Sequence, residues 1–147
     1  MTKTIIITGG CGFIGHHFVE HIHSNTDWSI VILDKLSYAS HGFERLRSTD
    51  TLSSSRVKVF TIDLIHPLSE GIKREIGNVD IVVHMAAETH VDNSIKDPHL
   101  FIKNNIQSTT TMLDYARELP NLETFFYFST DEVFGPALND TLYKEWD

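Results

Sequence analysis

Five short apolar runs recur along the chain, at residues 5–8, 29–33, 57–61, 80–84 and 124–129. They are rich in β-branched and aromatic residues, and their apolar positions follow one another without regular polar alternation. Strands that are covered on both faces have this pattern, which is typical of parallel sheets. The runs therefore predict five buried parallel strands.

Amphipathic helices are predicted between these strands. Apolar residues recur every four positions in two segments, at residues 14–22 and 68–76. A longer helix is expected over residues 97–119, with Asp97 as its N-cap and Pro98 at its first position. The alternation of strands and helices predicts an α/β fold with a doubly wound parallel sheet, the Rossmann fold, whose ligand site lies outside the carboxyl ends of the strands.

Composition places the chain among folded domains. Its 147 residues have room for one domain, with 41% hydrophobic and 22% charged residues, and the polar stretch 48–55 is expected to be a loop. The net charge of −8 disfavours a nucleic acid or an anionic membrane as partner. No apolar run is long enough for a membrane span, and the single Cys11 cannot form an internal disulfide, so we expect a cytoplasmic location.

A glycine-rich turn follows the first predicted strand. Gly10, Gly12 and Gly15 fit G-x-G-x-x-G, while Gly9, Gly12 and Gly15 fit the variant G-x-x-G-x-x-G. Glycines let the chain turn tightly, bring backbone N–H groups close to a pyrophosphate and pack a helix against the strand. Because this turn joins a strand to a helix, we interpret it as a dinucleotide-binding loop rather than an ordinary turn.

An acidic residue ends the second strand. Asp34 lies 19 residues beyond Gly15, where a carboxylate that binds the ribose hydroxyls belongs. Its charge would repel a 2′-phosphate, which favours NAD over NADP, although Lys35 could soften that repulsion. Asp63 ends the third strand, where either an adenine contact or a plain turn residue would fit.

Histidine and cysteine chemistry is the less favoured interpretation. His17 and His21 stand four residues apart on the first helix, but no Glu follows His17 as in H-E-x-x-H, so we expect no metal site. The four histidines of this helix are expected to decorate a solvated face: His16, His17, His21 and His23. Cys11 lies in the glycine loop with no base nearby in sequence, which disfavours a nucleophile.

Four segments together resemble one family. They are residues 8–15 (TGGCGFIG), 33–39 (LDKLSYA), 84–94 (HMAAETHVDNS) and 129–135 (STDEVFG). With them the sequence resembles the extended short-chain dehydrogenase/reductase family and, within it, the nucleotide-sugar 4,6-dehydratases. The resemblance implies an NAD-dependent lyase that converts dTDP- or UDP-glucose to a 4-keto-6-deoxy sugar.

The resemblance also implies which residues hold NAD. Beside the glycines, Phe13 and Ile14 would lie under the pyrophosphate. The remaining contacts would be Asp34, Lys35 and Ser37 at the adenosine ribose, Asp63 and Leu64 at the adenine, and Ala86, Ala87 and Thr89 along the nicotinamide half. A Thr-Asn pair that approaches the cofactor in the family is Asn104-Asn105 here, and a usual glycine just beyond it is Ser108.

In the dehydratases, the Thr-Asp-Glu after the fifth strand acts on the hexose. The resemblance implies that Thr130 hydrogen-bonds the sugar, Asp131 acts as acid and Glu132 as base. Loss of water across C5 and C6 needs one group that takes a proton and another that supplies one. Two neighbouring carboxyls suit this because their mutual repulsion separates their pKa values.

The family's Tyr-x-x-x-Lys motif is absent from these residues, since Tyr143-Lys144 has the wrong spacing. We therefore expect residues 1–147 to be a partial NAD-binding Rossmann domain, truncated before the sugar-binding domain and inactive alone. Residues 125–128 read as a strand buried on both faces, yet no later strand is available to pair with it. Family members dimerise partly through the helix corresponding to residues 97–119, so a homodimer is expected.

Two other functions remain open. An epimerase or decarboxylase of the same family is disfavoured because those reactions do not call for an acid–base carboxylate pair beside the threonine. A non-catalytic NAD-binding or protein-binding module is favoured by the missing Tyr and Lys.

Overall fold

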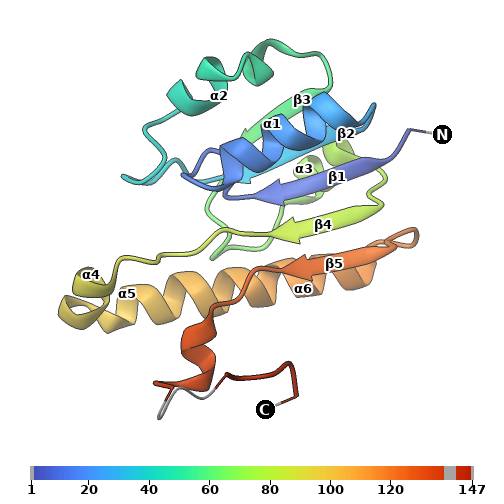
Figure 1. Ribbon diagram of the computed structural model, residues 1–147. Coiled ribbons are helices and arrows are strands. Elements are labelled where there is room, and N and C mark those ends of the chain that lie inside the picture. Colours follow the sequence, from blue (N-terminus) through green and yellow to red (C-terminus); the bar gives the residue numbers. More distant parts are fainter. Residues whose placement is uncertain (1, 138–141, 147) are drawn as a thin grey trace.

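One parallel sheet organises residues 2–137 and 142–146, the part of the chain that the computed structural model describes (Figure 1). Its strand order is β3-β2-β1-β4-β5. The strands are β1 (Thr4–Thr8), β2 (Ser29–Asp34), β3 (Val57–Thr61), β4 (Ile81–His84) and β5 (Thr124–Tyr127). The predicted α/β fold is confirmed, and the chain reverses its direction of travel across the sheet between β1 and β4, where such folds place their ligands.

Helices connect the strands. They are α1 (Gly15–Asn25), α2 (Glu44–Ser48), α3 (Glu70–Ile76), α4 (Val91–Lys96), α5 (Pro98–Ile102) and α6 (Ser108–Glu118), with 3₁₀ turns η1 (Thr51–Ser53) and η3 (Asp131–Phe134). A π-helical segment, η2 (Lys103–Gln107), joins α5 to α6 with helical backbone at both junctions. The described helices include none that is both long and apolar enough to cross a bilayer.

The long helix begins as predicted. The Asp97 carboxylate accepts a hydrogen bond from the backbone N–H of Leu100 at 3.2 Å, and Pro98 occupies the first turn. The sequence pattern did not reveal the π-helical segment, nor the short helices α2 and α4, which span only one or two turns. The predicted loop at 48–55 contains η1.

Two hydrophobic layers cover the sheet. Side chains of β1 alternate between them: Ile6 packs with Met112 of α6, while Ile5 and Ile7 pack with Val19 of α1. All five side chains are almost fully buried. The helices α3 and α6 therefore cover one face and α1 the other, which leaves the carboxyl ends of the strands as the open edge (Figure 1).

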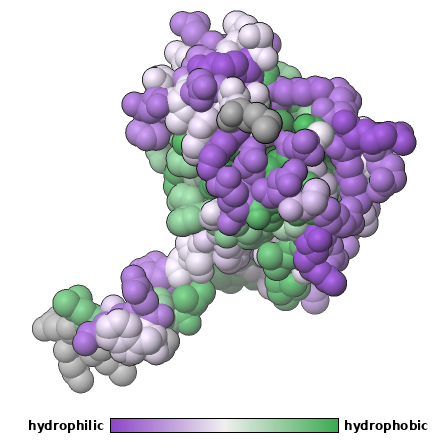
Figure 2. All heavy atoms as spheres, turned by 90° about the vertical axis from the view of Figure 1, so that its right-hand side faces the viewer, coloured by the Kyte–Doolittle hydropathy of each residue, from purple (hydrophilic) through white to green (hydrophobic). Residues whose placement is uncertain are grey.

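The last strand differs from the prediction. Phe126 is 53% and Tyr127 50% exposed, because β5 is the edge of the described sheet and pairs only with β4. The interpretation of residues 125–128 as a strand buried on both faces is therefore wrong for this structure. The segment that follows β5 projects away from the body of the molecule (Figure 2).

A buried histidine ties β4 to β1. Thr8 Oγ1 accepts hydrogen bonds from the backbone N–H groups of Met85 and Ala86, both at 3.0 Å, and lies 2.8 Å from His84 Nδ1. The Thr8 hydroxyl therefore donates to Nδ1, and the ring proton is on Nε2, which lies 3.1 Å from Thr109 Oγ1. Burial lowers the pKa of His84 to about 4.

Protonation of His84 is expected to destabilise the fold. The ordinary pKa is 6.5 and the folded pKa about 4, so the unfolded state binds more protons between these values. The free energy of unfolding should fall as the pH drops through this window, by up to about 3 kcal/mol from this residue. Denaturant unfolding at pH 7 and at about pH 5 measures the loss.

The exposed His66 supplies the matched control. His84→Gln should reduce the dependence of unfolding on pH, whereas His66→Gln should leave it unchanged. Equal pH dependence in the two variants would contradict the assignment to His84.

Candidate functional site

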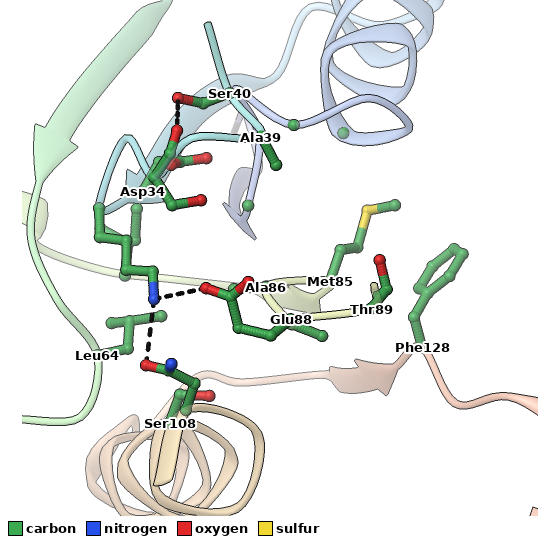
Figure 3. Close-up of a pocket in the computed structure, with 18 of the residues that line it drawn as sticks. Asp34, Ala39, Ser40, Leu64, Met85, Ala86, Glu88, Thr89, Ser108 and Phe128 are labelled. Atoms are coloured by element: carbon green, nitrogen blue, oxygen red, sulfur yellow. Dashed lines mark hydrogen bonds and ion pairs between the residues drawn. The ribbon is translucent and has the colours of Figure 1, made fainter. Parts of the chain in front are cut away.

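A cavity of about 340 Å³ opens at the carboxyl ends of the strands (Figure 3). The structure brings all fourteen predicted cofactor residues to its walls: Gly9, Gly12, Phe13, Ile14, Gly15, Asp34, Lys35, Ser37, Asp63, Leu64, Ala86, Ala87, Thr89 and Asn104. Sequence reasoning did not assign nine further lining residues to the site: Leu33, Ala39, Ser40, Ile62, Met85, Glu88, Ser108, Phe128 and Ser129. The predicted set is therefore one site in space, although its members come from segments far apart in the sequence.

The glycine loop packs too tightly for side chains. A Cβ on Gly15 would lie 2.1 Å from the Gly9 carbonyl oxygen, and Gly9 itself has φ +70°. The Gly12 N–H donates to the same carbonyl at 3.0 Å. No side chain caps the N-terminus of α1, and in its first turn the N–H groups of His16 and Phe18 donate to the Gly12 and Ile14 carbonyl oxygens at 3.3 and 3.2 Å. The loop thus has the tight, side-chain-free backbone of an anion cradle, in which an added Cβ would collide with the loop itself or with its neighbours.

Backbone hydrogen bonds hold Asp34 in place at the cavity wall. Its Oδ2 accepts from the Cys11 N–H at 2.9 Å and its Oδ1 from the Leu36 N–H at 2.8 Å. The side chain is buried except toward the cavity, so the carboxylate has a fixed orientation. Burial, and secondarily the charge of Asp34, raises the pKa of Cys11 to about 12. Cys11 is therefore a protonated thiol at neutral pH, unsuited to act as a nucleophile.

A polar network crosses the cavity (Figure 3). Lys35 Nζ lies 2.9 Å from Glu88 Oε1 and donates to Asn104 Oδ1 at 3.1 Å. Asn105 holds the Glu88 backbone through two hydrogen bonds, of 2.8 and 2.9 Å. The network joins the segments that follow β2 and β4 to the π-helical segment η2. The sequence alone did not point to Glu88, because its ion pair is formed with a lysine 53 positions earlier in the chain.

The acidic trio lies outside the cavity walls. Thr130, Asp131 and Glu132 are exposed, although their neighbour Ser129 lines the cavity. Thr130 Oγ1 accepts from the Glu132 N–H at 3.3 Å and caps η3. The structure therefore places the trio just beyond the end of β5, directly after the lining residue Ser129 but outside the cavity walls.

The first helix departs from its predicted histidine pattern. His16 is buried, and its Nδ1 donates to the Gly12 carbonyl oxygen at 2.9 Å, so the expectation that it decorates a solvated face is wrong. The reason is local, since the ring folds back over the glycine loop instead of pointing to solvent. His17 is exposed as expected. The residues that the structure describes contain no cluster of three His, Cys, Asp or Glu side chains able to hold a metal ion.

Comparisons with known proteins agree with this geometry. Residues 6–146 match the sequence profile of the GDP-mannose 4,6 dehydratase family. The dTDP-glucose 4,6-dehydratase of Escherichia coli is 39% identical over 140 residues, which cover 89% of this chain and 38% of the relative. The chain spans less than half the length of the first curated relatives that it matches.

Solved structures have the same fold. The dTDP-glucose 4,6-dehydratase DesIV of Streptomyces venezuelae, with NAD and TYD bound, superposes with a TM-score of 0.82 at 32% identity, covering 95% of this chain and 43% of that chain. The UDP-Glc/GlcNAc 4-epimerase of Campylobacter jejuni superposes with a TM-score of 0.76 at 29% identity, covering 90% and 39%. The fold is therefore similar to that of both dehydratases and epimerases.

Alanine substitution is expected to have opposite effects at two glycines: Gly15, which packs against the Gly9 carbonyl, and Gly71, which has open space around it. Gly15→Ala should lower the free energy of unfolding by about 3 kcal/mol, because backbone must move to admit the methyl group. Gly71→Ala, in helix α3 with no atom nearer than 3.8 Å to the new methyl group, should raise it by about 0.5–1 kcal/mol. Denaturant unfolding measures both, and a neutral Gly15→Ala would contradict the close packing.

Proposed function

Because the chain belongs to the GDP-mannose 4,6-dehydratase family, we propose that it is the NAD-binding part of a nucleotide-sugar 4,6-dehydratase. Its substrate would be dTDP- or UDP-glucose, and its product the 4-keto-6-deoxy sugar. The observation that carries this proposal is that all fourteen predicted cofactor residues line one and the same cavity. The Thr-Asp-Glu trio begins one residue after Ser129, which also lines this cavity.

The residues at the cavity suit a dinucleotide. The glycine cradle and the uncapped N-terminus of α1 would receive the pyrophosphate, next to Phe13 and Ile14. The fixed carboxylate of Asp34 has the chemistry to accept hydrogen bonds from two ribose hydroxyls. NAD⁺ bound here would supply a hydride acceptor for C4 of the sugar. Ala86 and Ala87, at the end of β4, are small enough to let the nicotinamide half approach closely.

The exposed trio would act on the sugar. The Thr130 hydroxyl would hold a hexose hydroxyl, Glu132 would remove the C5 proton, and Asp131 would protonate the departing C6 hydroxyl as water leaves. A 4-epimerase of the same family is the second candidate, favoured by the likeness to the Campylobacter jejuni enzyme. Epimerisation moves no water, so it gives the two adjacent carboxyl groups no task.

The proposal includes a homodimer, which exposed apolar side chains on the long helix support. Ile102, Ile106 and Leu113 are 55%, 61% and 46% exposed, and they lie on residues 97–119, the predicted dimer helix. Apolar side chains that recur on one exposed helical face are typical of contact surfaces. The net charge of −8 disfavours nucleic acid as a partner.

NAD⁺ should bind at least about tenfold more tightly than NADP⁺. The carboxylate of Asp34 repels a 2′-phosphate, and Lys35 is already held by Glu88 and Asn104, which limits its ability to offset that repulsion. Asp34→Asn should reduce the preference for NAD⁺ over NADP⁺ because it removes the negative charge. Glu88→Gln should also reduce this preference, because it weakens the ion pair that restrains Lys35. Calorimetric titration of each protein with both cofactors measures the dissociation constants.

Glu75→Gln is the matched control for Glu88→Gln, because Glu75 pairs with a lysine at the surface, remote from the cavity lining. Its cofactor preference should equal that of the original protein. Equal affinity of the unsubstituted chain for both cofactors would remove the proposed role of Asp34.

The acidic pair is tested in a chimaera in which the carboxyl-terminal part of the Escherichia coli relative follows these residues. Asp131→Asn or Glu132→Gln should slow formation of the 4-keto-6-deoxy product by about 10²–10⁴-fold, the usual effect of losing a positioned acid or base. Asp114→Asn, which removes an exposed carboxylate on α6, is the control and should retain the rate. Normal rates in both acid variants would exclude the proposed roles of Asp131 and Glu132, whereas a chimaera that forms no 4-keto-6-deoxy product but epimerises the sugar at C4 would favour the epimerase alternative.

A further inference from the structure

The imidazole of His16 is buried against the glycine loop, and the chemistry proposed above gives it no task. The residue is 7% exposed and is not among those that line the cavity. Its Nδ1 lies 2.9 Å from the Gly12 carbonyl oxygen. A carbonyl oxygen can only accept, so Nδ1 carries a hydrogen and donates it. The backbone N–H of His16 donates to the same oxygen at 3.3 Å, so one residue supplies two donors to one carbonyl.

These two hydrogen bonds fix the orientation of the peptide that joins Gly12 to Phe13. No peptide bond in the described part of the chain is cis. In a trans peptide, the C=O group and the N–H group that follows it point in opposite directions. Because the Gly12 carbonyl points along α1 toward His16, the Phe13 N–H points the other way, out of the N-terminal end of the helix.

The Phe13 N–H is available to a ligand. Neither it nor the Ile14 N–H donates to any group in the described part of the chain. Both residues line the cavity, and they are 73% and 61% exposed. An amide whose carbonyl already accepts hydrogen bonds is polarised and donates more strongly. The contact from His16 therefore orients the Phe13 N–H and also strengthens it as a donor.

We propose that His16 is a positioning residue for the pyrophosphate of the dinucleotide, an inference that rests on the proposed binding of NAD. The ring would not touch the ligand, since it lies outside the cavity lining. It acts through the peptide between Gly12 and Phe13, whose N–H would donate to a pyrophosphate oxygen. Without the Nδ1 donor, the Gly12 carbonyl would keep only the longer hydrogen bond from the backbone, and the peptide would be free to turn.

Substitutions at His16 separate the donor from the bulk of the ring. His16→Leu should weaken ADP binding about three- to tenfold, because it keeps an apolar side chain against the loop but removes the hydrogen bond. His16→Asn should stay within about twofold of the original affinity, since its amide nitrogen stands at the same position along the side chain as Nδ1. Calorimetric titration with ADP measures each dissociation constant.

His21→Leu is the matched control. His21 is an exposed histidine of the same helix, and its ring contacts Asn25 instead of the glycine loop. The affinity of this variant for ADP should equal that of the original chain. A loss in His21→Leu as large as in His16→Leu would overturn the inference, because it would place the effect on the helix as a whole.

Adenosine distinguishes a role at the pyrophosphate from a general effect on the fold. It lacks the pyrophosphate, so NMR titration should give the same adenosine affinity for His16→Leu and the original chain. Equal losses of ADP and adenosine affinity in His16→Leu, or a loss in His16→Asn as large as in His16→Leu, overturn this inference and leave the proposed function standing.

The ring hydrogen of His16 provides a test without any substitution. In ¹⁵N NMR spectra of the unsubstituted chain, Nδ1 of His16 should carry a hydrogen. A hydrogen on Nε2 alone would overturn the inference, because Nδ1 could not then donate to the Gly12 carbonyl. A chain that binds neither ADP nor NAD⁺ overturns the proposed function as well.

Discussion

The close approach of helix α1 to the end of β1 is the constraint on which the rest of the site depends. A Cβ on Gly15 would lie 2.1 Å from the Gly9 carbonyl oxygen, so only glycine permits the helix to begin there. The same turn brings the Cys11 N–H to within 2.9 Å of the Asp34 carboxylate. One backbone geometry thereby creates the anion cradle and orients the acid beside it.

The part of the cavity wall opposite this turn is polar, and the folded state is less stable than it would be with an apolar wall. The charge pair of Lys35 and Glu88 is largely buried, and burying an ion pair often contributes little to folding compared with apolar packing. The unpartnered groups of Asn104 and Ser108 add to that cost. An apolar wall would be more stable but would offer nothing to a polar ligand, so the wall has the character of a binding surface rather than of a core.

Local patterns were sufficient to predict the sheet and the glycine loop. Buried parallel strands are continuously apolar, and the glycine spacing is a short-range requirement, so both are visible in a few consecutive residues. The contact of Glu88 with Lys35 depends on two segments far apart in the chain, and the burial of His16 depends on how the glycine turn folds back. The exposure of Phe126 depends on which strands pair with β5, and the apolar pattern of residues 125–128 carries no such information.

The central claim is that the cavity at the carboxyl ends of the strands binds NAD. Amide chemical shifts of the ¹⁵N-labelled chain, followed by NMR during titration with NAD⁺, test it most directly. Saturable shifts are expected at Phe13, Ile14, Leu36 and Ala87, which line or adjoin the cavity, and none is expected at exposed Glu75 on the far end of α3. Saturable shifts confined to residues away from the cavity, or no shifts at millimolar NAD⁺, would contradict it.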